Sequence, residues 1–238
     1  MTIYKDRQSK ITLFDLDGTA VELWEIHKKV YRELIHEQWE IDNVNFLEEG
    51  YVPGKAPEDI VRTVLKNRGC DSSSIEPKIR FIKPALARLY PPAVKEGEVN
   101  VLPGVFDLLK RLGEMHVLRG VLTGNHYDLT EILLEKTGLN EYFDFSTTAS
   151  DSIDRVERMK LAIRKGEEIL GRKVNLGNVY FLDDGLEGIS ISKQVGIKHV
   201  SVATGYKIGY EKLLVAKPYH VLEDLSDMQE VLRILELE

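Results

Sequence analysis

The spacing of hydrophobic residues divides the chain into two kinds of segment. Residues 10–14 form a short apolar run, which predicts a buried strand. From residue 21 the apolar positions instead recur every three or four residues, which predicts an amphipathic helix over 21–39 and further helices after it. Pro91-Pro92 and the polar residues that follow predict a linker. We therefore expect the segment 21–97 to be helical, with no strand of comparable strength.

From Val101 onward, apolar runs of strand length alternate with amphipathic helical stretches. This alternation predicts an α/β fold with a parallel sheet covered by helices on both faces. The helical segment then interrupts one domain, because the first strand belongs to the same sheet. We expect a core of residues 1–20 and 98–238 and an inserted helical domain of residues 21–97. The later predicted strands are 116–122, 142–145, 178–182 and 197–202, and the longer predicted helices after 150 are 156–170 and 224–237.

Composition narrows the class of protein. A chain of 238 residues can hold one large domain or a core with a smaller insert, and a net charge of −7 argues against a general nucleic-acid binder. Cys70 is the single cysteine, which excludes an internal disulfide and a thiolate metal cluster. Lys5, Asp6 and Arg7 stand where a signal peptide needs an apolar stretch, and no apolar run is long enough to cross a bilayer. We expect a cytoplasmic protein without a membrane partner.

Polar residues follow three of the predicted strands at the point where each strand ends. Right-handed crossovers bring the carboxyl ends of parallel strands to one edge of the sheet, where ligands bind in open α/β folds. We therefore expect these residues to share one site. They are Asp15 and Asp17 after the first strand, Thr123, Gly124 and Asn125 after the second, and Asp183 and Asp184 after the fourth.

The types of these residues indicate a cation beside an anion. Buried carboxylates that lie together repel one another unless a cation compensates them, and a site of oxygen ligands favours Mg²⁺. Thr123 offers a hydroxyl, and Gly124 and Asn125 offer backbone N–H groups at a helix start, which suits a bound anion. Two simpler interpretations stay open: Asp183 or Asp184 caps the helix that follows, or Thr123 does so.

These stretches carry a resemblance to a known family. Asp15-Leu16-Asp17-Gly18-Thr19 resembles the first motif of the haloacid dehalogenase superfamily, Thr123-Gly124-Asn125 its second, and Asp183-Asp184-Gly185 its fourth. The order and separations also match. The basic third motif has two candidates, Arg155 and, as the alternative, Lys160. The resemblance implies a Rossmann-like core and a phosphatase branch with a helical cap between motifs one and two, similar to phosphoglycolate phosphatases and β-phosphoglucomutases.

The resemblance also implies roles for the site residues. Asp15 is the expected nucleophile, which forms an aspartyl-phosphate, and Asp17 the expected general acid and base. Because dehalogenases typically lack the second acid, Asp17 favours phosphate chemistry over carbon–halogen cleavage. The expected metal is Mg²⁺ and the expected substrate a small phosphorylated metabolite. The implied metal ligands are Asp15, Asp17, Asp184 and Asp183, and the implied phosphate-binding residues are Thr123, Gly124, Asn125 and Arg155.

The inserted helices are expected to select the substrate. Lys55, His27 and Trp24 are the candidate contacts, although Trp24 also suits a helix core, His27 a solvated helix face and Lys55 a loop charge. His126 is expected on the surface of a helix first turn, with a position facing the pocket as the alternative. A mutase, a phosphonate hydrolase and a catalytically silent phosphate-binding or regulatory protein stay open as alternatives. The sequence leaves monomer and homodimer open.

Overall fold

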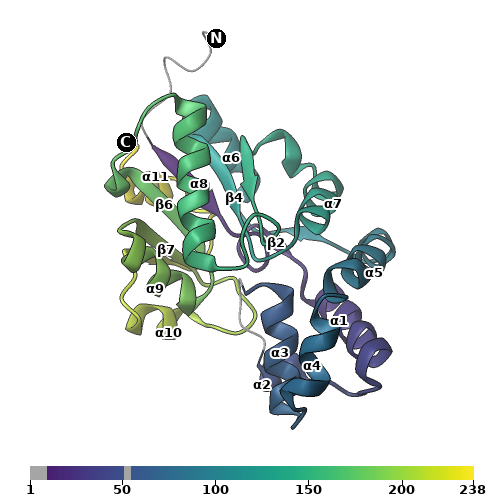
Figure 1. The fold of residues 1–238 in the computed structure, drawn as a ribbon. Coiled ribbons are helices and arrows are strands. Elements are labelled where there is room, and N and C mark those ends of the chain that lie inside the picture. Colours follow the sequence, from purple (N-terminus) through teal and green to yellow (C-terminus); the bar gives the residue numbers. More distant parts are fainter. Residues whose placement is uncertain (1–9, 51–54) are drawn as a thin grey trace.

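The computed structural model describes residues 10–50 and 55–238, and it has two parts (Figure 1). One is a sheet with helices packed on it, and the other is a group of helices beyond one end of that sheet. Lys5, Asp6 and Arg7, on which the expectation about a signal peptide depends, lie outside the described residues. Within the described ranges, no helix combines the length and the apolar character needed to span a membrane.

The core is a six-stranded parallel sheet in the order β5-β4-β1-β6-β7-β8. β1 lies between β4 and β6, and its last residue, Phe14, is in register with Val121 and Leu182. The chain therefore leaves β1, β4 and β6 at nearly the same level, which places their following residues side by side. The strands are β1 (Ile11–Phe14), β4 (Leu118–Leu122), β5 (Phe145–Thr147), β6 (Val179–Asp183), β7 (Lys198–Val202) and β8 (His220–Leu222).

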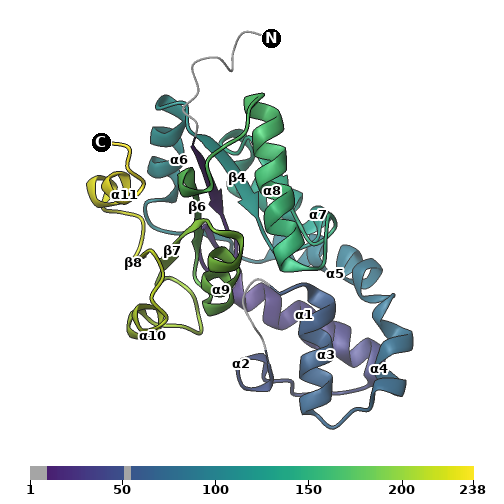
Figure 2. The same cartoon turned by 60° about the vertical axis from the view of Figure 1, so that its left-hand side comes forward.

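Alternating side chains of the strands supply the two faces of the sheet. Figure 2 shows α8 and α6 on opposite faces of the sheet. Ile11 and Leu13 are buried in the cluster that includes α8, whereas Phe14 belongs to the cluster that includes α6. This arrangement confirms the predicted three-layer α/β/α fold. The core helices are α6 (Val105–Glu114), α7 (Tyr127–Thr137), α8 (Arg155–Leu170), α9 (Leu186–Val195), α10 (Tyr210–Val215) and α11 (Met228–Ile234), with 3₁₀ turns at Leu139–Glu141 and Leu176–Asn178.

The remaining helices form a unit that we call the helical insert, residues 24–96. A short antiparallel pair, β2 (Val21–Glu22) and β3 (Asn100–Val101), joins it to the core. The helix predicted from residue 21 therefore starts later, because residues 21 and 22 pair with β3 instead. The helices of the insert are α1 (Trp24–Trp39), α2 (Phe46–Glu49), α3 (Pro57–Asn67), α4 (Ser72–Ile79) and α5 (Ile82–Glu96).

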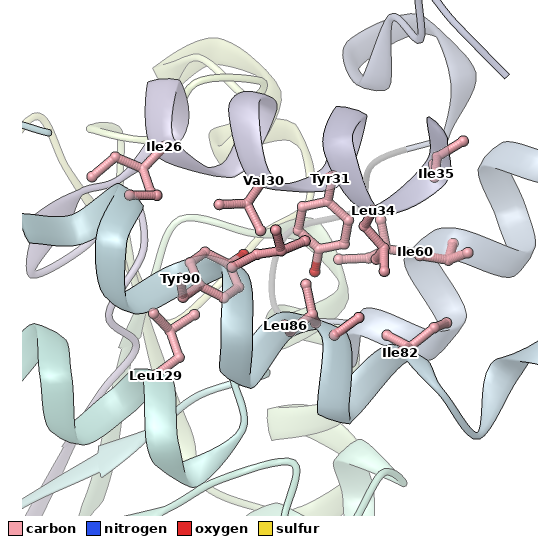
Figure 3. Packing of buried hydrophobic residues seen from close by; sticks show 14 of the residues in the cluster. Ile26, Val30, Tyr31, Leu34, Ile35, Ile60, Ile82, Leu86, Tyr90 and Leu129 are labelled. Atoms are coloured by element: carbon pink, nitrogen blue, oxygen red, sulfur yellow. The ribbon is translucent and has the colours of Figure 1, made fainter. Parts of the chain in front are cut away.

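The linker expected at Pro91-Pro92 is wrong, because both prolines lie inside α5. A proline inside a helix costs about 3 kcal/mol or more. Here the flanking residues Tyr90 and Val94 are buried in the core of the insert, so tertiary packing outweighs the local preference. Figure 3 shows this packing, with Leu129 of α7 beside Tyr90. The insert therefore packs onto the core through α7 as well as through the β2–β3 junction.

Candidate active site

Three buried carboxylates meet where β1 and β6 end. Asp15 directly follows β1, Asp183 is the last residue of β6, and Asp184 follows it. One carboxylate oxygen from each lies within 4.8 Å of the others. Their exposed fractions are 2%, 0% and 1%, so solvent does not separate their charges. The parallel register of the two strands thus produces the cluster that the polar strand ends predict.

The cluster is electrostatically unfavourable as a set of three anions. Burial, and then Asp183, raise the pKa of Asp15 well above its usual value, while Arg155 and a backbone hydrogen bond from Leu16 oppose this shift. Burial likewise raises the pKa of Asp184, and the charges of Asp183 and Asp15 raise it further. His199 lies 3.8 Å from Asp183, but burial lowers the pKa of His199 to about 3, so this imidazole adds no positive charge to the cluster.

The donor set fits a hard divalent cation. Asp183 Oδ1 and Asp184 Oδ1 are buried and lack a hydrogen-bond partner within the described part of the chain. Such oxygens are costly unless something coordinates them, and an all-oxygen set suits Mg²⁺-type ions. A cation would also reverse the repulsion that raises these pKa values.

Gly18 lets the turn after β1 approach this cluster. Its φ of +81° is left-handed, and a Cβ at this position would lie 2.7 Å from Asp184 Oδ2. The turn carries Asp17, which is 8% exposed. Glycine therefore holds the second acid of the Asp15-Leu16-Asp17 stretch beside the acid cluster.

Asp17 contacts the helical insert through His27. His27 Nε2 lies 3.0 Å from Asp17 Oδ2, and His27 Nδ1 lies 2.5 Å from the Tyr90 hydroxyl. His27 is 4% exposed, so the solvated helix face considered for it is wrong. The helical period places it on the buried side of α1, together with Tyr31. A side chain of the insert thus reaches the core acid directly.

A small cavity beside Asp15 has the character of an anion site. Thr123, Gly124 and Arg155 line it, and Thr123 Oγ1 accepts a hydrogen bond from the Asn125 N–H, which fixes the turn after β4. Arg155 Nη1 donates to Glu187 Oε2 at 3.1 Å, which keeps the guanidinium over the sheet edge. Of the two basic candidates, the structure brings this one to the acids.

Lys160 lies away from this cavity. Its side chain is 46% exposed and pairs with Glu157 at 2.7 Å along the same helix. Arg158, which no motif in the sequence indicated, also lines the cavity and is 2% exposed. Arg158 donates to the Ser152 carbonyl at 2.8 Å, and burial, followed by the neighbouring Arg155, lowers its pKa to about 10. Its helical position, three residues after Arg155, was the available signal.

A second small cavity lies between the sheet edge and the insert. Lys55 and Asn125 line it, and Lys55 Nζ lies 3.5 Å from Glu187 Oε1. Trp24 does not line it, because its ring stacks on Tyr206 at a centroid distance of 5.3 Å. Among the described residues, its lining consists of Asp15, Asp17, His27, Tyr31, Lys55, Ile60, Thr123, Gly124 and Asn125.

His126 also differs from expectation. It is 8% exposed rather than on the surface, and its Nε2 lies 2.9 Å from Glu58 Oε1 of α3. Although burial opposes ionisation, the hydrogen bond from His126 holds the pKa of Glu58 below its usual value. No local pattern links residues 58 and 126, so this contact between insert and core could be seen only in the folded structure.

Comparison with known proteins identifies the family. The family model described as haloacid dehalogenase-like hydrolase matches residues 12–202. The chain belongs to the haloacid dehalogenase-like hydrolase family. The resemblance drawn from the motifs is thereby confirmed. A curated relative, the phosphoglycolate phosphatase of Synechococcus elongatus, is 25% identical over 131 residues, which are 55% of this chain and 58% of that protein.

Solved structures of this family share the fold over nearly the whole chain. CbbY from Rhodobacter sphaeroides, in complex with phosphate, gives a TM-score of 0.75 at 20% identity, over 92% of this chain and 96% of that one. β-Phosphoglucomutase from Clostridium difficile gives 0.76 at 19% identity, over 95% and 97%. At these identities the likeness establishes the fold, and the chemistry must be argued from the site.

Proposed function

We propose that the protein is a Mg²⁺-dependent phosphatase that hydrolyses a small phosphate monoester through an aspartyl-phosphate on Asp15. The observation that carries this proposal is the position of Asp15 in the wall of both cavities. On one side lies the cationic cavity with Arg155, and on the other the cavity that reaches the insert. A phosphoryl group in the first would place its leaving group in the second.

Asp15 and Asp17 together divide the reaction into two phosphoryl transfers, the first to Asp15 and the second to water. A carboxylate oxygen of Asp15 attacks phosphorus, the bond from phosphorus to the leaving oxygen breaks, and Asp17 gives that oxygen its proton. Asp17 then takes a proton from water, which attacks the aspartyl-phosphate and releases inorganic phosphate. The contact of His27 with Asp17 Oδ2 at 3.0 Å orients the carboxyl group for both steps.

The other residues of the site bind and neutralise the phosphoryl group. Asp15, Asp183, Asp184 and the backbone carbonyl of Asp17 would hold Mg²⁺, which supplies positive charge and Lewis acidity when bound. Thr123, Gly124, Asn125 and Arg155 would bind the transferring oxygens through hydroxyl, N–H and guanidinium donors.

The second cavity favours a small leaving group that carries no second phosphate. Among the described residues of the insert, Lys55 supplies its only cationic side chain, and Glu187 already offsets that charge. A second phosphate would need more donors than this. The cavity therefore supports hydrolysis of a small monoester over a phosphomutase reaction. The relative named phosphoglycolate phosphatase suggests 2-phosphoglycolate as one compound to assay.

The test measures phosphate release from p-nitrophenyl phosphate and from a panel of phosphorylated metabolites, with Mg²⁺ or with EDTA. The panel includes 2-phosphoglycolate, triose phosphates and hexose phosphates. We expect turnover that EDTA abolishes and that Asp15→Asn lacks. Acid quenching of Asp17→Asn with radiolabelled p-nitrophenyl phosphate, whose leaving group needs no proton, should trap phosphate on the protein. A protein that releases no phosphate from any of these compounds with Mg²⁺ present would contradict the proposal.

A further inference from the structure

The loop after β7 contacts three parts of the site within three consecutive residues. The Thr204 hydroxyl donates to the Gly18 carbonyl at 2.6 Å, in the turn that carries Asp17. Gly205 lies against Asp184, because a Cβ on Gly205 would be 1.8 Å from Asp184 Oδ2. The Tyr206 hydroxyl accepts hydrogen bonds at the start of α1. The motif comparison assigns none of these three residues a role.

Tyr206 caps the first helix of the insert from the core. The first N–H groups of a helix lack acceptors within that helix, and Leu23, at the N-cap of α1, makes no side-chain cap. The Tyr206 hydroxyl accepts from the Leu23 N–H at 2.7 Å and from the Trp24 N–H at 3.0 Å. Its ring stacks on Trp24 at an interplanar angle of 30°. Hydrogen bonds and stacking together fix where α1 begins and in which direction it runs.

The start of α1 determines where His27 lies. His27 is three residues after Trp24, so it projects from the first turns of the same helix. Its contact with Asp17 joins the two side chains across the boundary between insert and core. A shift at the start of α1 therefore moves His27 relative to Asp17. Tyr206 itself is close to this pair, since burial and then the charge of Asp17 raise its pKa.

We propose that Thr204, Gly205 and Tyr206 form a positioning loop for the reaction. The loop holds Asp184, the Asp17–Gly18 turn and the start of α1 in one arrangement, so that acid cluster, general acid and insert are aligned together. None of the three residues touches the reacting atoms; each acts through a neighbour. The kinetic part of this inference depends on the proposed phosphatase function, and the metal-binding part does not.

The first test is Tyr206→Phe, which keeps the ring and removes the acceptor. p-Nitrophenolate leaves without a proton, whereas an alkoxide needs Asp17, so misplacement of Asp17 should affect the two substrates differently. We expect kcat/KM for the best alkyl phosphate of the panel to fall about 10-fold to 100-fold, and that for p-nitrophenyl phosphate to fall much less. Equal losses on both substrates, or no loss on either, would overturn the role of Tyr206.

Tyr219→Phe is the matched control. It also removes a hydroxyl from the core, one that donates to Glu236 Oε1 at 2.9 Å, but beside the start of β8, at the opposite end of the sheet. We expect the ratio of the two kcat/KM values to stay at its wild-type value in this variant. Thermal unfolding of both variants shows whether a change in kinetics follows a change in stability. A shifted ratio in Tyr219→Phe would mean that the Tyr206 effect is not specific to the loop.

The second test is Gly205→Ala, read by Mn²⁺ binding in electron paramagnetic resonance without substrate. The added methyl group must displace the Asp184 carboxylate, so we expect at least about tenfold weaker binding of Mn²⁺. Gly209→Ala is the control, because a Cβ there meets no atom within 4 Å. If Gly205→Ala does not fold, Thr204→Val replaces it with the same expected loss. Unchanged Mn²⁺ affinity in a folded variant would overturn the loop's role at the metal site.

The two tests separate this inference from the proposed function. If the wild-type protein releases no phosphate from the panel, the proposed function fails, while Mn²⁺ binding still decides whether Gly205 holds Asp184 in place. If the wild-type protein is active and the loop variants match it in both measurements, the positioning loop fails and the phosphatase assignment stands.

Discussion

The two ends of the central sheet both carry clusters of charged residues, but one end gathers charges of the same sign and the other pairs opposite charges. At the carboxyl end, Asp15, Asp183 and Asp184 crowd one sign of charge into a buried volume. At the amino end, Lys198 of β7 donates to the Tyr180 hydroxyl at 3.0 Å and pairs with Glu236. The first arrangement is unfavourable without a ligand, whereas the second is complete within the protein.

The pKa shifts express the same contrast. Burial and mutual repulsion raise the pKa of the carboxyl-end acids. At the amino end, the hydrogen bonds from Lys198 and Tyr219 lower the pKa of Glu236 to about 2. Partial burial works against Lys198, yet its bonds to Glu236 and Tyr180 leave its pKa above the usual value. Crowded acids therefore mark the end where we propose that the reaction takes place, and paired charges mark the end that stabilises the fold.

The largest expected effect comes from Asp15→Asn. The substitution removes the proposed nucleophile and one of three crowded anions, so activity and stability should change in opposite directions. We expect kcat to fall by about 10⁴-fold or more, and the unfolding midpoint in EDTA to rise. Steady-state kinetics and thermal unfolding measure the two. A midpoint that falls would mean that Asp15 stabilises the fold, and the contrast between the two ends would then be wrong.

Arg155→Met should give the next largest effect. Arg155 lines the cationic cavity and opposes the raised pKa of Asp15, so its loss should lower kcat/KM about 100-fold. Lys160→Met, in the same helix, is the control and should stay within about twofold, because it removes only an exposed pair. The reverse order of the two losses would restore Lys160 as the basic residue of the third motif.

The site could be predicted from the sequence wherever local order determined it. The acids at the ends of β1 and β6 follow apolar runs directly, so the register of a parallel sheet brings them together. His27, Glu58 and Glu187 could not be placed in this way. Their partners Asp17, His126 and Arg155 are 10, 68 and 32 residues away, and each of these contacts lies between separate elements.

The fold could likewise be predicted where the local pattern was strong, and the prediction failed where an element depends on tertiary packing. Strong strands flanked by amphipathic helices were found, but β8 and α10 were missed because each is short and only partly buried. Pro91-Pro92 suggested a linker, because the sequence alone shows only that proline disfavours a helix interior. The cluster that buries α5, and with it the contact of Tyr90 with His27, depends on four other helices.

Addition of Mg²⁺ should raise the free energy of unfolding through the acids at the carboxyl end of the sheet alone. A ligand that binds only the folded state stabilises it by about 2.7 kcal/mol at 100 times its Kd. We expect urea unfolding of the wild-type protein to show this gain. Most of it should be lost in Asp184→Asn, because that variant lacks one of the buried carboxylate oxygens without a hydrogen-bond partner. A gain of the same size in Asp184→Asn would place the cation elsewhere.

Lys198→Met tests the amino end. The substitution removes an ion pair and the cation over the Tyr180 and Tyr219 rings, at 4.9 Å and 4.8 Å from their centroids. We expect the free energy of unfolding to fall by about 1 kcal/mol, and kcat and Mg²⁺ affinity to stay unchanged. Urea unfolding and the phosphatase assay measure these quantities. Any loss of Mg²⁺ affinity would show that the two ends are coupled through the sheet.

The smallest expected effect is the pH dependence contributed by Glu236. Its folded pKa of about 2 lies below the ordinary 4.5, so the ionised form is stabilised in the folded state. This contribution is fully present above the unfolded pKa and is lost as the pH falls toward 2. The wild-type protein should therefore exceed Glu236→Gln in unfolding midpoint near pH 6, and the difference should shrink toward pH 3. The side chain is half exposed, so salt should reduce the difference as well. A difference that grows on acidification would mean that Glu236 is held in its protonated form, and the amino end would then resemble the carboxyl end.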